Sequence, residues 1–263
     1  MLLLFCVLPA GVPPTTTNLN ALHLAALHSS LLLKDLINST AESLRGLIPS
    51  ESAAVVRMLI DEGADVNAQA LGGETALHRA AAAGNIDAMH ELLSSGAAVD
   101  EPNDEGRTAL GWAAHMGDVR TAQRLIKMGA NYSNTDSKGF TALHNAARNG
   151  REIISALLNA GCILDAAAQD ERTALHIAAS RANFEAVEAM LDAGAPVSLI
   201  DDAGETPLHA AARAGGVAAV KALVIAGAAV EATTAAKQTP LHMAAAAGKA
   251  QTVDALLVAG ASL

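Results

Sequence analysis

Apolar residues along this chain are spaced in a way that predicts pairs of short helices. Leu143, Ala146 and Ala147 lie three and four positions apart, which places them on one face of a helix. They follow Thr141, whose hydroxyl can cap the helix N-terminus. Gly150 comes next and is expected to end the helix in a left-handed conformation.

A second apolar run predicts another helix in the same unit. Its members again recur at three- and four-residue spacing and are Ile153, Ile154, Leu157 and Leu158. Gly161 is expected to end this helix. The polar segment up to the next threonine carries Asp and Gly at turn positions, so it predicts an extended loop or hairpin. We call this projecting loop the finger.

The unit recurs with a regular period. Glycines equivalent to Gly161 stand 33 residues apart, with one interval of 32, at Gly63, Gly96, Gly129, Gly161, Gly194, Gly227 and Gly260. Twelve residues after each of the first six, a threonine opens the tetrapeptide Thr-Ala/Pro-Leu-His, in which Gly111 once replaces the histidine. Such a period indicates one supersecondary unit stacked many times rather than a single closed core.

These motifs resemble the ankyrin repeat, a family with a 33-residue period and a Thr-Pro-Leu-His-x-Ala signature. The resemblance covers six units from Gly73 onward and a half-unit at Ser52–Gln69, which ends in Gly63-Ala-Asp-Val-Asn67. It implies an all-α dominated repeat solenoid of helix–turn–helix units with projecting β-hairpin or loop fingers. It also implies protein binding through the finger tips and first helices of the concave face. Asn67 resembles the loop asparagine that hydroxylases modify in some members.

The predicted organisation has four parts. Residues 1–17 form an irregular N-terminal arm, 18–41 a degenerate capping helix pair, 42–72 a degenerate repeat and 73–263 six repeats. A single repeat with an insertion at 29–50 is the alternative for the N-terminal region.

Two irregularities interrupt the regular array. The 32-residue interval places a one-residue deletion in the turn between the two helices that precede Gly161. The last repeat is as apolar as an interior one at Leu241, Val253 and Leu256. A polar outer face is usual for a terminal repeat, so either the array continues or a partner covers this end.

Charge and composition narrow the function classes. The net charge is −10 and no basic run is interleaved with aromatic residues, so nucleic acid is not expected as a partner. No stretch has the length of a membrane span. Residues 1–10 are apolar but lack the basic residues of a secretory signal. Cys162 is expected to be a buried small side chain in a reducing compartment, so we predict a cytoplasmic or nuclear protein.

The motif histidines do not predict a metal site. They occupy one equivalent position in successive or alternate units, at His78, His144, His176, His209 and His242. Adjacent helices pack about 8–10 Å apart, whereas zinc ligands lie about 2 Å from their ion. Each imidazole is instead expected to bridge backbone groups of neighbouring loops. No cofactor, metal or catalytic residue is predicted, and the chain is not expected to be an enzyme.

A binding surface is the remaining candidate site. Basic and apolar residues recur where first helices end and on the adjacent finger strands. The predicted protein-binding residues are Arg107, His115, Met116, Phe140, Arg148, Asn149, Arg172, Arg181, Glu205 and Arg213. A row of arginines in an acidic chain suits the acidic groups of an extended partner, and Phe140 is the best single anchor. The alternative is that these residues serve solubility.

The sequence therefore predicts a non-catalytic protein–protein interaction scaffold. The alternative is a targeting or regulatory module of a larger enzyme or channel whose functional domain lies beyond this segment. The identity of the partner and the oligomeric state stay open at this level.

Overall fold

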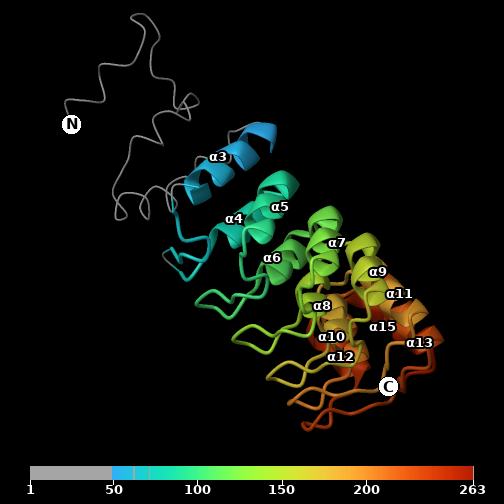
Figure 1. Ribbon diagram of the computed structural model, residues 1–263. Helices are drawn as coiled ribbons and strands as arrows, with labels where there is room; N and C mark the ends of the chain where they lie inside the picture. The colour runs from blue at the N-terminus through green and yellow to red at the C-terminus, as the bar shows by residue number, and fades with distance from the viewer. Residues whose placement is uncertain (1–48, 62, 71, 263) are drawn as a thin grey trace, which may run out of the picture. The chain divides into compact units, whose positions relative to one another are not determined.

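The computed structural model describes residues 49–61, 63–70 and 72–262 (Figure 1). The chain divides into two compact units, residues 1–104 and residues 105–263. The predicted arm at 1–17 and the predicted capping helix pair at 18–41 lie outside the described residues.

The first unit contains three described helices, α3 (Pro49–Asp61), α4 (Ala76–Ala82) and α5 (Ile86–Ser94). α3 packs against α5 and supplies the second helix of the degenerate repeat predicted at 42–72. The Arg57 guanidinium lies 2.6 Å from the Glu91 carboxylate and links the exposed edges of these two helices.

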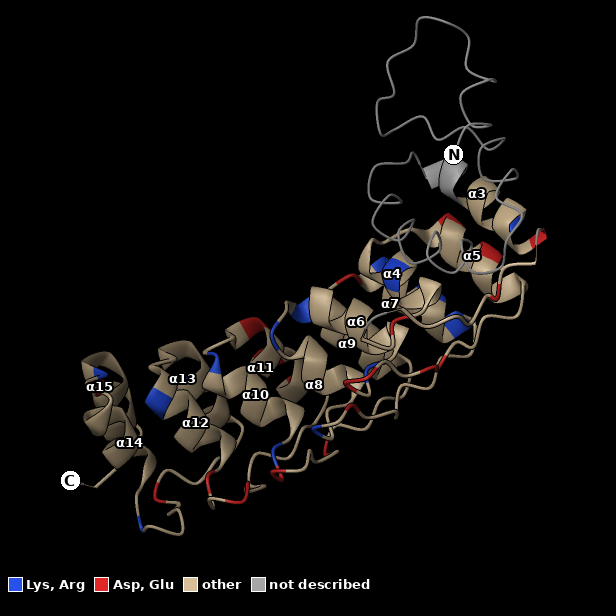
Figure 2. Ribbon diagram, turned by 90° about the vertical axis from the view of Figure 1, so that its left-hand side faces the viewer, with Lys and Arg blue, Asp and Glu red and all other residues tan. Residues whose placement is uncertain are grey.

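The second unit contains five complete repeats. Their first helices are α6 (Ala109–Met116), α8 (Ala142–Ala146), α10 (Ala174–Ser180), α12 (Pro207–Ala214) and α14 (Pro240–Ala246). Their second helices are α7 (Val119–Lys127), α9 (Arg151–Asn159), α11 (Phe184–Asp192), α13 (Val217–Ile225) and α15 (Ala250–Val258). First helices stack on first helices and second helices on second helices. The first-helix layer lies between the fingers and the second-helix layer (Figures 1 and 2).

Regularly spaced leucines and alanines fill the space between the two layers. Leu143 and Leu157, one from each helix of a repeat, are at most 1% exposed, and their equivalents in neighbouring repeats are similarly buried. Ala146 is fully buried where the first helices approach each other. Small side chains permit this close stacking, so the predicted apolar faces are confirmed.

The one-residue deletion changes how one repeat turns between its helices. Gly117 ends α6 with φ 72°, in the left-handed region. Gly150 does not follow this pattern: it has φ −75° and is the N-cap of α9, so its predicted left-handed role is wrong. The missing residue shortens α8 to five residues and leaves Arg148 in the turn beyond it. Gly161 ends α9 with φ +96°, as predicted.

The fingers are loops, and the described residues contain no β-strand. Each finger is joined to the next by a backbone hydrogen bond, as when the Gln169 N–H donates to the Lys138 carbonyl at 3.0 Å. A left-handed glycine turns the finger at this contact. A Cβ on Gly139 would lie 2.7 Å from the Gln169 nitrogen. Glu171 occupies the equivalent corner with φ 58°, a conformation that side-chain-bearing residues rarely adopt.

Candidate protein-interaction face

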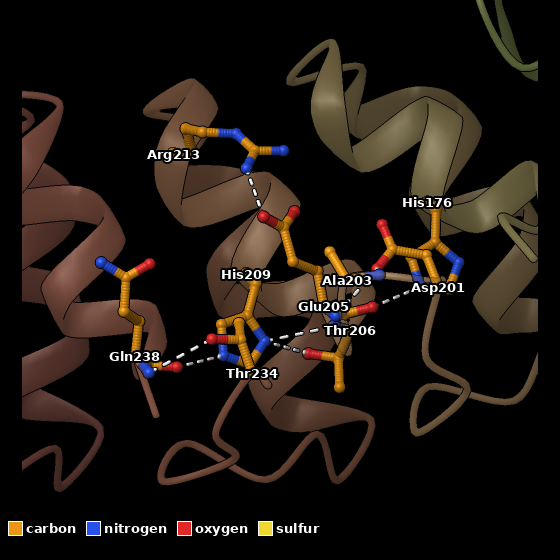
Figure 3. A network of polar contacts seen from close by, with 9 residues as sticks. All are labelled: His176, Asp201, Ala203, Glu205, Thr206, His209, Arg213, Thr234 and Gln238. Carbon is orange, nitrogen blue, oxygen red and sulfur yellow. Dashed lines mark hydrogen bonds and ion pairs between the residues drawn. The ribbon is translucent and has the colours of Figure 1, made fainter. Parts of the chain in front are cut away.

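Three motif histidines of the second unit, His144, His176 and His209, each hydrogen-bond to a backbone carbonyl of the next finger. Figure 3 shows His176 and His209. His176 Nε2 lies 3.0 Å from the Glu205 carbonyl oxygen, and His209 Nε2 lies 3.0 Å from that of Gln238. The Thr206 N–H donates to His209 Nδ1 at 3.1 Å. Because Nδ1 accepts this bond, Nε2 carries the proton and donates to the carbonyl. The imidazoles thus bridge neighbouring loops, as the sequence predicts.

Burial keeps these imidazoles neutral. Desolvation lowers the pKa of His144, His176 and His209, and the backbone hydrogen bond of each ring only partly opposes it. These side chains are structural links between repeats. Within the part of the chain that the structure describes, no group of three or more His, Cys, Asp or Glu residues could hold a metal ion.

Asparagine side chains join the ends of successive first helices. Asn149 Nδ2 donates to the carbonyls of Ala114 and His115 at 2.9 and 3.0 Å. Asn183 Nδ2 donates in turn to the carbonyls of Ala147 and Asn149, at 3.2 and 2.7 Å. These amides add side-chain donors to carbonyls at the helix ends, and the Ala114 carbonyl also accepts from the Gly117 N–H at 3.2 Å. The predicted binding residue Asn149 therefore has a structural role.

The asparagine links bring basic residues from three repeats together. His115, Arg148 and Arg181 lie at or beside the carbonyls and amides that these links join. We call these three residues, with Arg107, the cationic cluster. Partial desolvation, followed by the charges of Arg181 and Arg107, lowers the pKa of Arg148. Burial lowers the pKa of His115 first, and the three arginines lower it further.

Two arginines of the cluster have no anionic partner among the residues that the structure describes. Neither Arg148 nor Arg181 forms an ion pair with any described carboxylate, and both are exposed. Each lies at the C-terminal end of a first helix, where the helix dipole favours positive charge. The helix ends therefore offset part of the repulsion between the two cations, and both charges stay exposed to solvent.

Trp112 supports one side of the cationic cluster. The Arg107 guanidinium lies 4.7 Å from the centre of the Trp112 ring, within the range of a cation–π contact. His115 meets the other part of the indole edge-on, with ring centres 6.2 Å apart. A Cβ on Gly111 would lie 2.9 Å from Arg107 Cγ. Gly111, which replaces the motif histidine, thus leaves space for the Arg107 side chain. The replacement was noticed in the sequence, but this role was not predicted.

Part of the Phe140 side chain packs against His144 and is not available to a partner. Its ring stacks on His144 with 5.5 Å between centres and 5° between planes, and the residue is half-buried. One face of the aromatic ring therefore supports the histidine link, which leaves only the remainder of the side chain for a partner.

Three other predicted binding residues pair within the chain. Arg172 Nε donates to Asp170 of its own finger at 2.7 Å. Arg213 lies 2.5 Å from the Glu205 carboxylate, and Glu205 is only 8% exposed (Figure 3). Arg172, Glu205 and Arg213 thus differ from Arg148 and Arg181 because their charges are paired within the chain. Met116 remains open, with 58% of its surface exposed, and it follows His115 directly.

Two residues outside the cluster have local explanations. Asn67 accepts from the Ala98 N–H at 2.8 Å through its side-chain oxygen, which ties two successive fingers of the first unit together. Cys162 is half-buried rather than buried as predicted, and this partial burial raises the pKa of its thiol to about 12, so the thiol is protonated at neutral pH. None of the described helices is long and apolar enough to cross a membrane.

Comparisons with known proteins agree with the repeat architecture. A family model for ankyrin repeats in three copies matches residues 46–136, 117–201 and 183–263. No match is found among curated proteins. A crystal structure of the ankyrin repeat domain of Bcl-3, described as a unique member of the IkappaB protein family, is similar with a TM-score of 0.65 and 30% identity. That similarity covers 72% of this chain and 88% of the Bcl-3 chain. The chain belongs to the ankyrin repeat family, and the all-helical repeat solenoid predicted from its sequence is confirmed.

Proposed function

We propose that this chain is a non-catalytic protein-interaction module that binds an acidic segment of another protein at the cationic cluster. The family's fold is one that binds other proteins, and the coarse assignment follows from it. The observation that carries the finer proposal is the pair of exposed arginines, Arg148 and Arg181, which have no carboxylate partner among the described residues.

The electrostatic setting supports an acidic ligand. The chain has a net charge of −10, and acidic residues recur along the projecting loops (Figure 2). Against this background the three arginines of the cationic cluster form a local positive centre, and the charges of Arg107 and Arg181 repel that of Arg148. A carboxylate that approaches two guanidinium groups gains charge-assisted hydrogen bonds and relieves that repulsion. Exposed Met116 beside the cluster offers an apolar contact to a flanking residue of the partner.

The experiment compares two double variants with equal loss of charge. R148Q/R181Q removes the unpaired arginines, whereas R120Q/K127Q removes two exposed cations of α7 in the other helix layer. Binding of acidic random-sequence peptides is measured by fluorescence anisotropy at several salt concentrations. We expect R148Q/R181Q to weaken binding at least about tenfold, which corresponds to about 1.4 kcal/mol, and R120Q/K127Q to bind like the wild type.

Affinity capture with the same variants extends the test to natural partners. Proteins retained by the wild type and by R120Q/K127Q but lost from R148Q/R181Q are the expected partners. Equal peptide binding by all three proteins, with no salt dependence, would refute the proposal. We propose a reducing intracellular compartment as the site of action, and the half-buried, protonated Cys162 thiol is compatible with that location.

A further inference from the structure

The second helices of the last two repeats expose apolar residues where other second helices are polar. Ile225 at the end of α13 is 87% exposed, and Val258 at the end of α15 is 90% exposed. The equivalent positions in the preceding three repeats are Lys127, Asn159 and Asp192. α13 contains one charged residue, Lys221, and α15 contains one, Asp254. A helix that is apolar around most of its circumference is normally covered on more than one side.

Each exposed position of α13 has an exposed counterpart on α15. Along α13 these positions are Ala218, Lys221 and Ile225, and their counterparts on α15, which also exposes Ala250, are Gln251, Asp254 and Val258. Members of each pair are 33 residues apart and so occupy the same height in adjacent repeats. α13 and α15 pack side by side in one layer (Figure 1). We call the six residues the outer patch.

The outer patch is complementary to itself. Suppose that two copies of the chain meet through their outer patches. Let a two-fold axis lie in the plane where they touch, midway between α13 and α15 and parallel to both helices. This rotation places α13 of one molecule opposite α15 of the other without changing the height of any residue. Lys221 then faces the second copy's Asp254, and Ile225 faces the second copy's Val258. Both contacts occur twice, as a two-fold interface requires.

The charges give this arrangement its specificity. Neither Lys221 nor Asp254 forms an ion pair with any described residue of its own chain, although both are exposed. In the two-fold contact each would face an opposite charge. By contrast, a contact that places α13 on α13 would bring two lysines together, and like charges in an interface cost affinity.

We propose that a second copy of this chain binds the outer patch, giving a symmetric dimer through α13 and α15. The two molecules overlap only at these repeats, because the rotation directs the remaining repeats of the second unit away on opposite sides. The contact is therefore in the small class, below about 1,200 Å², that is typical of weak association. The cationic cluster lies on the first-helix layer and stays open in this dimer, so the inference goes beyond the proposed binding function.

Charge exchange tests the dimer without disturbing the core. Sedimentation equilibrium of the full chain is measured over a wide concentration range for wild type, K221D, D254K and the double variant K221D/D254K. We expect reversible dimerisation of the wild type, at least about tenfold weaker association of each single variant, and recovery in the double variant. K127D, which changes an exposed lysine on α7, is the matched control and should associate like the wild type.

A mixture of the two single variants provides the sharpest result. K221D carries two negative charges in the patch and D254K carries two positive charges, so each repels itself but pairs with the other. The mixture is expected to form a heterodimer that neither variant forms alone. A wild type that stays monomeric at every concentration, single variants that associate normally, or a mixture that stays monomeric would each overturn the proposal. Circular dichroism confirms that the variants are folded.

Discussion

The side-chain nitrogen Nδ2 of Asn149 lies 3.0 Å from the carbonyl oxygen of His115, in the preceding repeat. The same nitrogen lies 2.9 Å from the carbonyl oxygen of Ala114. One amide thus binds two carbonyls at the end of α6, immediately beside Arg148. The contact ties the backbone next to Arg148 to the backbone of His115, another member of the cluster.

Replacing Asn149 with alanine should therefore destabilise the fold and weaken the site. Removing the amide leaves two carbonyls without this donor, at a cost of about 1–3 kcal/mol. Urea denaturation measures the stability, and acidic-peptide binding measures the site. Asn159→Ala, at an exposed position on α9, is the control and should change stability by less than about 0.5 kcal/mol. Equal stability of the two variants would show that the Asn149 contact contributes nothing.

Substitutions at two equivalent finger corners, Glu171 and Gly139, should change the stability of the protein in opposite directions. Glu171 has φ 58°, so Glu171→Gly should relieve left-handed strain and stabilise the protein by roughly 0.5–1 kcal/mol. Gly139→Ala should destabilise it by more than about 1 kcal/mol, because the new Cβ would lie 2.7 Å from the Gln169 nitrogen. Thermal unfolding of both variants measures these changes.

Glu171→Ala separates the backbone effect from the loss of a carboxylate. It removes the charge but keeps a Cβ in the left-handed conformation, so it should not reproduce the gain from glycine. If alanine stabilises the protein as much as glycine does, charge rather than strain is responsible.

Gly161 provides a test of the helix stop. Its φ is +96°, and an added Cβ would lie 3.2 Å from the Tyr132 hydroxyl oxygen. Gly161→Val should cost about 1–3 kcal/mol, whereas Arg148→Gln, at an exposed and unpaired position, should change stability by less than about 0.5 kcal/mol. Similar melting temperatures for the two variants would argue against a conformational role for this glycine.

The buried histidines predict that stability falls in mild acid. Burial lowers the pKa of His144, His176 and His209 in the folded chain, whereas the unfolded residues titrate near pH 6.5 with an ordinary pKa. Below about pH 6.5 the unfolded state therefore binds more protons. Stability from the neutral imidazoles is complete above that pH and is lost as the pH falls toward the lowered pKa values.

Urea midpoints between pH 7.5 and 5.5 measure this dependence, in a range above the ordinary pKa of carboxylates. Each histidine contributes at most about 1.4 kcal/mol per pH unit. His176→Gln removes one titrating group and should make the profile shallower, while also lowering stability at neutral pH. A profile that keeps its full slope in this variant would contradict the assignment.

The repeat and its core could be predicted from sequence because equivalent residues meet equivalent neighbours. Leu143 and Leu157 each hold a fixed position in the repeat that neighbouring repeats also fill with an apolar residue, so their burial follows from the period alone. The same reasoning correctly assigned the motif histidines to loop bridging. These features depend on local spacing and on a neighbour of identical construction.

The candidate site was less predictable because it depends on departures from the period. Arg172 and Arg148 look alike in the sequence, but Asp170 pairs with the first and no described carboxylate with the second. Asn149 was predicted to be a binding residue, but its amide bonds to carbonyls of the preceding repeat, a contact between repeats that local patterns do not encode. Gly111 was noticed as an exception, yet its purpose required the position of Arg107 over Trp112.

The one-residue deletion before α9 shows how an array of this kind can change the side chains presented at the end of a first helix. α9 keeps its register in the second-helix layer, so neighbouring repeats still stack. Only the connection changes, and Arg148 leaves the helix for the turn while Asn149 secures it from behind. In evolutionary terms, a change in chain length at this connection alters which side chains are exposed there and leaves the stacking of the neighbouring repeats intact. Gains and losses of single residues there are a route to diversification separate from substitution.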